Sequence, residues 1–224
     1  MTHTFGKLVG AALVAAVLTL SAGPYFDPAQ AQSGHAMTAM ATSSTKAAGL
    51  RSGLNMLFQE HIYLAAAATG AALGGREAEF KAAAGALDAN SIAISKAIGS
   101  VYGQGAEDAF LPLWRKHIGM VVDYTVGVAS NDKAKQDKAV ADLIGYTQDF
   151  GAFLQSANPN LPKSVVADLV KHHVVTLKAV IDAQASKDQA KTFATLRTAA
   201  GHMQMIADPL AEAIVKQFPD KFGG

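Results

Sequence analysis

Residues 55–64 read NMLFQEHIYL, residues 111–120 read LPLWRKHIGM and residues 167–176 read ADLVKHHVVT. These stretches share a leucine and a histidine that return at an interval of 56 residues, namely Leu57, Leu113 and Leu169 with His61, His117 and His173. A gap-free alignment of 50–105, 106–161 and 162–217 places apolar residues on apolar residues along most of its length, and Ala78, Ala134 and Ala190 also coincide. Because a repeat determines the architecture of a domain, we predict three copies of one structural unit.

Helical periodicity dominates the chain on both sides of these stretches. Alanine is abundant and apolar residues recur at spacings of three and four, which is typical of amphipathic helices. Glycine, serine, asparagine and proline interrupt the pattern, leaving segments at 50–73, 77–101, 107–129, 133–156, 163–185 and 188–217. We therefore predict an all-α fold of three antiparallel αα-hairpin repeats, each about 56 residues long, packed as one six-helix bundle.

The N-terminal region has the pattern of an export signal. Lys7 precedes an apolar run at 8–20, and Ala29-Gln30-Ala31 forms a small-x-small cleavage site. We predict a signal peptide at 1–31, a flexible leader at 32–46 and a helical domain at 47–222. The expected location is periplasmic or secreted, with no membrane span after cleavage; an uncleaved N-terminal anchor is the alternative.

The composition excludes several classes of function. The chain has no cysteine, and therefore no disulfide and no thiolate ligand or nucleophile. A formal net charge of +1 without a basic cluster argues against nucleic acid as a partner. Hydrolase, phosphate-loop, His-Glu-x-x-His and covalent-haem motifs are missing, as is the Glu-x-x-His of di-iron bundles. The sequence favours a non-catalytic protein.

The periodic histidines have polar counterparts across each predicted hairpin. In an antiparallel hairpin, residues equidistant from the turn lie at one level. This pairs His61 with Asn90, His117 with Tyr146, and His173 with His202. The pattern predicts a polar layer inside an apolar bundle, where an unsatisfied polar group costs about 1–3 kcal/mol.

One interpretation of this layer is a metal site, because neutral imidazole is the commonest metal ligand. Met120 and Met205 each follow a histidine by three residues, and imidazole with thioether favours copper. The candidate ligands are His173, His202, Met205, His117, Met120 and His61, and His35, Met37 and Met40 of the leader could add to them. Affinity should fall as the pH drops through about 6.5, where free imidazole is protonated.

Two other interpretations stay open. The histidines could be hydrogen-bonded core residues of a structural or interaction module of the cell envelope, or two of them could bind haem non-covalently. If the hairpins form a ring, the periodic histidines can converge on one ion, whereas in a row His61 and His173 would be about 20 Å apart. In either layout we expect His173 and His202 to be close neighbours.

The chain also resembles a known family in its segments Glu60-His61, Trp114-Arg115-Lys116-His117-Ile118, His202-Met203-Gln204-Met205 and Gln217-Phe218-Pro219-Asp220-Lys221-Phe222. It is similar to a family of secreted bacterial helical proteins without a settled function. Some relatives carry an appended domain similar to the N-terminal domain of copper amine oxidases. The resemblance covers about 50–222, implies copper over zinc, and assigns no catalytic residue.

Overall fold

The computed structural model describes residues 45–223, and this part of the chain consists of helices joined by short turns. The helices are α1 (Lys46–Leu73), α2 (Glu77–Tyr102), α3 (Gln104–Ala129), α4 (Lys133–Ala157), α5 (Lys163–Ala185), α6 (Gln189–Gln217) and the short α7 (Pro219–Phe222). No strand occurs between residues 45 and 223, which confirms the all-α prediction. The predicted signal peptide, and the leader up to residue 44, lie outside the described residues.

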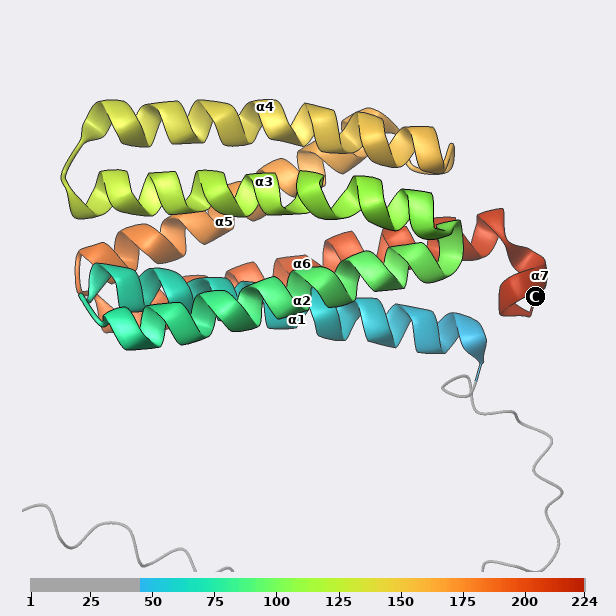
Figure 1. The fold of residues 1–224 in the computed structure, drawn as a ribbon, viewed down its shortest axis with the longest axis horizontal. Helices are drawn as coiled ribbons and strands as arrows, with labels where there is room; N and C mark the ends of the chain where they lie inside the picture. The colour runs from blue at the N-terminus through green and yellow to red at the C-terminus, as the bar shows by residue number, and fades with distance from the viewer. Residues whose placement is uncertain (1–44, 224) are drawn as a thin grey trace, which may run out of the picture. The chain divides into compact units, whose positions relative to one another are not determined.

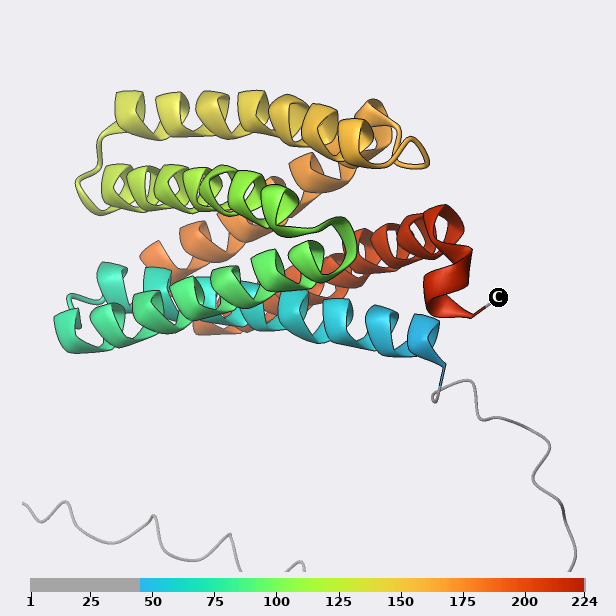
Figure 2. The same ribbon diagram turned by 45° about the vertical axis from the view of Figure 1, so that its right-hand side comes forward.

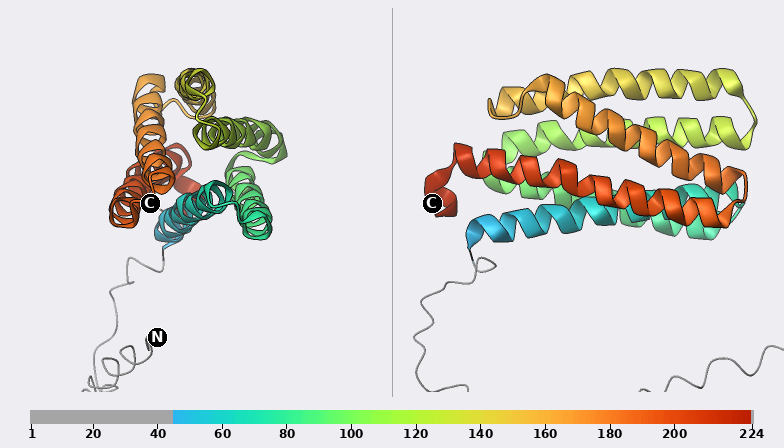
Figure 3. Two further views of the ribbon diagram at one scale, coloured as in Figure 1. Left: turned by 90° about the vertical axis from the view of Figure 1, so that its left-hand side faces the viewer. Right: turned by 180° about the vertical axis from the view of Figure 1, so that it is seen from behind.

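The long helices pack against one another as a helical bundle (Figures 1 and 2). Each long helix contacts the helices before and after it in the chain, and α6 returns to pack against α1. Viewed end-on, these contacts form a closed circuit (Figure 3, left). Helices α1, α3 and α5 also contact one another across the middle of the circuit. Their inward faces therefore share one interior.

Three connections in the chain have the same backbone geometry. Gly75, Asn131 and Lys187 each adopt a positive φ, of 67°, 55° and 58°. The next residue then donates its N–H to the carbonyl five residues before it, in the bonds Arg76–Ala71, Asp132–Gly127 and Asp188–Ala183. This pairing ends a helix in the manner of a Schellman motif. Asp132 and Asp188 also cap the next helix, because their carboxylates accept the N–H groups of Lys135 and Lys191.

An aromatic cluster fills the interior between α1, α3 and α4. The ring of Trp114 stacks on Phe110 and Phe58, with centroids 5.3 and 5.8 Å away. Phe150 and Tyr146 extend the cluster from α4, where their rings are 5.6 Å apart. Burial of large aromatic rings stabilises the fold and leaves them little freedom to move. The cluster therefore holds the middle turns of α1 and α3 in a defined register.

Close packing of α4 against α5 depends on one glycine. A Cβ on Gly151 would lie 2.5 Å from the carbonyl oxygen of Lys163, so Gly151→Ala should destabilise the protein by about 1–3 kcal/mol. Gly145 lies on the same helix, and a Cβ there would meet no atom within 4 Å. Gly145→Ala should therefore stabilise the protein by about 0.5–1 kcal/mol, the usual helical preference for alanine. Urea unfolding of both variants tests the pair, and equal effects would contradict this packing.

Within residues 45–223, no helix combines the length and the apolar character that crossing a bilayer requires.

Candidate metal centre

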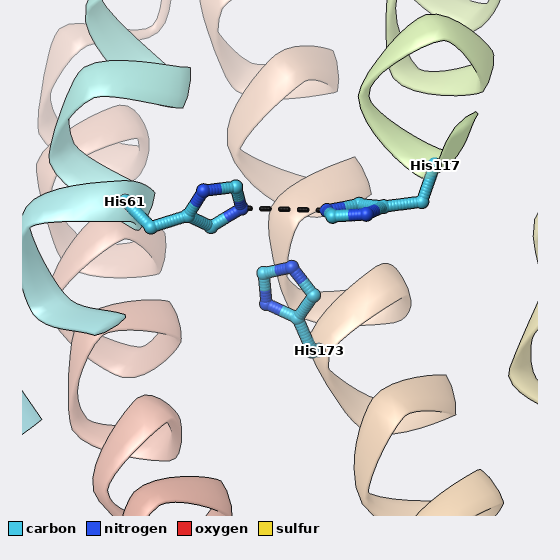
Figure 4. A group of neighbouring side chains, drawn as sticks. All are labelled: His61, His117 and His173. Carbon is cyan, nitrogen blue, oxygen red and sulfur yellow. Dashed lines mark hydrogen bonds between the residues drawn. The ribbon is translucent and has the colours of Figure 1, made fainter. Parts of the chain in front are cut away.

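Three buried histidines meet where the inner faces of α1, α3 and α5 come together. His61, His117 and His173 expose only 1, 4 and 5% of their surface, and each comes from a different helix. One ring nitrogen from each lies within 4.8 Å of those from the other two. Nε2 of His61 lies 3.5 Å from Nε2 of His117. Figure 4 shows the three rings pointing into one common space.

The distances among the three histidines decide between a ring and a row of hairpins, the two layouts that the sequence left open. The ring centroids of His61 and His173 are 5.9 Å apart, and those of His117 and His173 are 6.4 Å apart. A row of hairpins would hold the first pair at about 20 Å, the width of two helix spacings. The row is therefore wrong, because α1, α3 and α5 contact one another directly.

Burial keeps all three imidazoles uncharged. It lowers the pKa of His117 to about 3 and the pKa of His173 to about 4, with the neighbouring histidines adding to the effect. The pKa of His61 is also well below its ordinary value, first because of burial and then because of His117 and His173. Each ring therefore keeps a free lone pair at neutral pH. Proton competition at this site begins well below the pH of about 6.5 expected for free imidazole.

The polar atoms of this group are poorly satisfied by the protein. Within the described residues, Nδ1 of His61, of His117 and of His173 has no hydrogen-bond partner, and the same holds for Nδ1 of His202. Buried polar atoms without partners are rare in native proteins and call for an explanation. Metal–imidazole bonds of about 2.0–2.1 Å would separate neighbouring ligand nitrogens by about 3.3–3.6 Å. The 3.5 Å between His61 and His117 agrees with that separation, so these residues fit a metal ion.

The site is uncharged as well as buried. The group of potential ligands contains histidines alone, with no aspartate or glutamate. The charges that act on the pKa values of its members come from other histidines. A metal ion bound here would therefore receive three neutral ligands from the protein.

Two aromatic side chains form the immediate surroundings. Trp114 lies 5.0 Å from the ring of His61 and 4.7 Å from that of His117, and Tyr146 lies 5.2 Å from His117. Neither Nε1 of Trp114 nor the hydroxyl of Tyr146 has a hydrogen-bond partner among residues 45–223. Pairing residues equidistant from the predicted hairpin turn placed Tyr146 opposite His117. It gave no indication of Trp114, although this residue precedes His117 by one helical turn.

His202, a predicted ligand, lies near enough to His173 to help lower its pKa but is itself bonded to the backbone. Its Nε2 donates to the carbonyl of Leu169 at 2.8 Å, and its ring lies 4.1 Å from that of His172. The structure brings His173 together with His61 and His117, and His202 is not part of that group. Asn90 of α2 makes a similar bond, in which its side-chain amide donates to the carbonyl of Leu57 in α1 at 2.9 Å.

The two predicted methionine ligands lie in unlike environments. Met205 is 56% exposed, whereas Met120 is partly buried against the core. Met203, which was not a predicted ligand, lines a cavity of about 40 Å³ together with His117 and His173. The exposed Met205 therefore does not contribute to the buried surroundings of the three histidines. His35, Met37 and Met40 lie outside the described residues.

Comparison of the chain with known proteins finds no matching family model, no matching curated protein and no matching solved structure.

Proposed function

We propose that this is an exported, non-catalytic protein that binds one copper ion, in its cuprous state, through His61, His117 and His173. The observation that carries the proposal is the convergence of three buried imidazoles, from three helices, to ring nitrogens within 4.8 Å of one another. Burial lowers the pKa of each of them, so all three can act as ligands at neutral pH.

A purely structural role explains this group less well. Core histidines that only support a fold usually bond to the protein, as His202 does through Nε2 to the carbonyl of Leu169, although its Nδ1 has no partner among residues 45–223. The three convergent rings share a single long contact of 3.5 Å, and each has an unpartnered Nδ1 within the described part of the chain. Three neighbouring polar groups held without partners cost stability. A ligand-binding role gives a reason for that cost.

The charge of the site favours a monovalent ion. The solvation cost of burying an ion rises with the square of its charge, and three imidazoles contribute no negative charge to offset it. Zinc also accepts three histidines, but then holds a water or hydroxide as its fourth ligand. Cuprous ion is soft, accepts three ligands, and is well suited to an apolar pocket with Met203 nearby. Haem is disfavoured because the cavities that touch these histidines measure only about 40, 280 and 20 Å³.

We further propose that the domain consists of three hairpin repeats packed as a six-helix bundle around an approximate threefold axis. Positive φ values at Gly75, Asn131 and Lys187 recur at the 56-residue interval of the histidines. The bonds Asn90–Leu57 and His202–Leu169 are also equivalent, since each member of the second lies 112 residues beyond its counterpart. One ligand from each repeat would then meet at the axis, which explains why the three ligands are of one type.

The test is metal loading of the natural protein purified without an affinity tag. Under anaerobic conditions it should bind one equivalent of cuprous ion per chain in competition with a chromogenic chelator. His61→Gln/His117→Gln/His173→Gln should bind none, because a side-chain amide is a poor ligand for this ion. The matched control is His202→Gln, which changes a buried histidine outside the group and should retain one equivalent. Equal loading of all three proteins would exclude the site.

The same experiment identifies the metal, and the N-terminus of the chain in the periplasmic fraction tests export. Stoichiometric zinc with no cuprous ion bound would retain the site and overturn its assignment to copper. Export rests on the pattern at 1–31, and a mature chain beginning at Gln32 in the periplasmic fraction is the expected result. A cytoplasmic chain beginning at Met1 would contradict it.

A further inference from the structure

A second cavity adjoins the histidine group on the side of α2 and α3. It measures about 280 Å³, and its lining includes His61 and His117. Its wall on α1 is made of small side chains, Ala65, Ala68 and Ala72. Val122 and Val126 of α3 also line it and are 42 and 43% exposed, so the cavity reaches the surface there.

The walls are almost entirely apolar. Besides the histidines, only Thr69 and Thr125 bring polar atoms to the lining. The hydroxyl of Thr125 donates to the carbonyl of Val121 at 2.8 Å, and that of Thr69 bonds to Gln184 at 2.9 Å. Both hydroxyls are thus already engaged. The lining contains no lysine, arginine, aspartate or glutamate, so it offers no partner to a charged ligand.

The volume sets the size of an occupant. An engineered apolar cavity of about 150 Å³ holds benzene, and a void left empty inside a protein costs stability in proportion to its volume. A cavity of 280 Å³ therefore accommodates a substituted ring. It is too small and too deep for a helix or an extended chain segment, because Ala65 and Ala68 in its wall are only 4 and 6% exposed.

We propose that this cavity binds a small uncharged ring compound, about the size of a substituted benzene, with any polar end directed toward His61 and His117. The cavity is formed by side chains of the metal-free protein. The proposal therefore goes beyond the metal site and does not depend on it.

The test uses metal-free protein in the presence of a chelator, with p-cresol as the probe and benzoate as its charged counterpart of similar size. Trp114 is the only tryptophan of the chain and lies 5.0 Å from His61, so its fluorescence should report occupancy. Calorimetry gives the affinity independently. We expect p-cresol to bind with a dissociation constant on the order of 0.1–1 mM, and benzoate at least about tenfold more weakly.

Filling variants locate the binding. Ala68→Leu and Ala65→Leu place extra carbons in the cavity and should each weaken p-cresol binding at least about tenfold. The matched control is Ala67→Leu. Ala67 lies directly before Ala68 in α1, is exposed and does not line this cavity. Circular dichroism checks that each variant is folded, and either filling variant suffices. No p-cresol binding by the natural protein, equal affinity for benzoate, or wild-type affinity in a folded filling variant would each overturn the proposal.

Discussion

Replacing His173 by leucine should raise the free energy of unfolding of the metal-free protein at pH 7 by about 1–3 kcal/mol. The same change should weaken cuprous ion binding by about 100- to 1000-fold. His173 is 5% exposed, and its Nδ1 has no hydrogen-bond partner in the described part of the chain. Leucine has a similar volume and no polar atom to bury, so the variant avoids that cost. Urea unfolding and chelator competition measure the two effects.

The size of the binding effect follows from the number of ligands. Complete structural metal sites contribute about 10–16 kcal/mol with four ligands, which is about 2.5–4 kcal/mol for each. Since about 1.4 kcal/mol is a factor of ten, losing one ligand weakens binding by two to three orders of magnitude. A gain of stability together with this loss of affinity would indicate that the histidine serves ligand binding at the expense of the fold.

His202→Leu is the control with the opposite expected sign. It removes the N–H that the carbonyl of Leu169 accepts at 2.8 Å and leaves this part-buried carbonyl without its side-chain partner. We expect a loss of about 1–3 kcal/mol in the free energy of unfolding, with cuprous affinity unchanged. If His173→Leu destabilised the metal-free protein as much as His202→Leu, the convergent histidines would be structural residues and the metal proposal would lose its main support.

Acid should destabilise the metal-free protein steeply below about pH 6.5. In the unfolded chain each histidine titrates near its ordinary pKa of about 6.5. In the folded protein, burial lowers the pKa of His117 to about 3 and that of His173 to about 4. Between these values the unfolded chain binds more protons than the folded one, so stability rises with pH. The full contribution is present above about pH 6.5 and is lost as the pH falls toward 4.

The slope is large because several histidines titrate together. Each can contribute up to about 1.4 kcal/mol per pH unit, so His117 and His173 together approach about 3 kcal/mol per unit below pH 6. Urea unfolding at pH 7.5, 6.5, 5.5 and 4.5 measures the slope. His61→Gln/His117→Gln/His173→Gln should show a much flatter profile over this range. Parallel profiles for the two proteins would show that the acid sensitivity originates elsewhere in the chain.

The helices could be predicted because their signals are local. Apolar spacing and short breakers predicted segments at 133–156 and 163–185, and the structure has α4 at Lys133–Ala157 and α5 at Lys163–Ala185. One difference is at the start of α3, where Gly103 to Gly105 suggested a longer break. Gly103, with φ of 89°, makes the whole connection, and Gly105 lies inside the helix. One residue with positive φ suffices to end a helix, which composition alone does not show.

The site could be predicted only in part. The interval of 56 residues identified His61, His117 and His173 as equivalent, because position along a helix is a property of sequence. Pairing across the predicted hairpin turn suggested His202, and the spacing of three residues from His202 suggested Met205. In the structure His202 bonds to the carbonyl of Leu169 and Met205 is 56% exposed. Spacing gives the face of a helix on which a side chain lies. Which faces meet depends on how the helices pack, and contact among α1, α3 and α5 brings three distant histidines to one point.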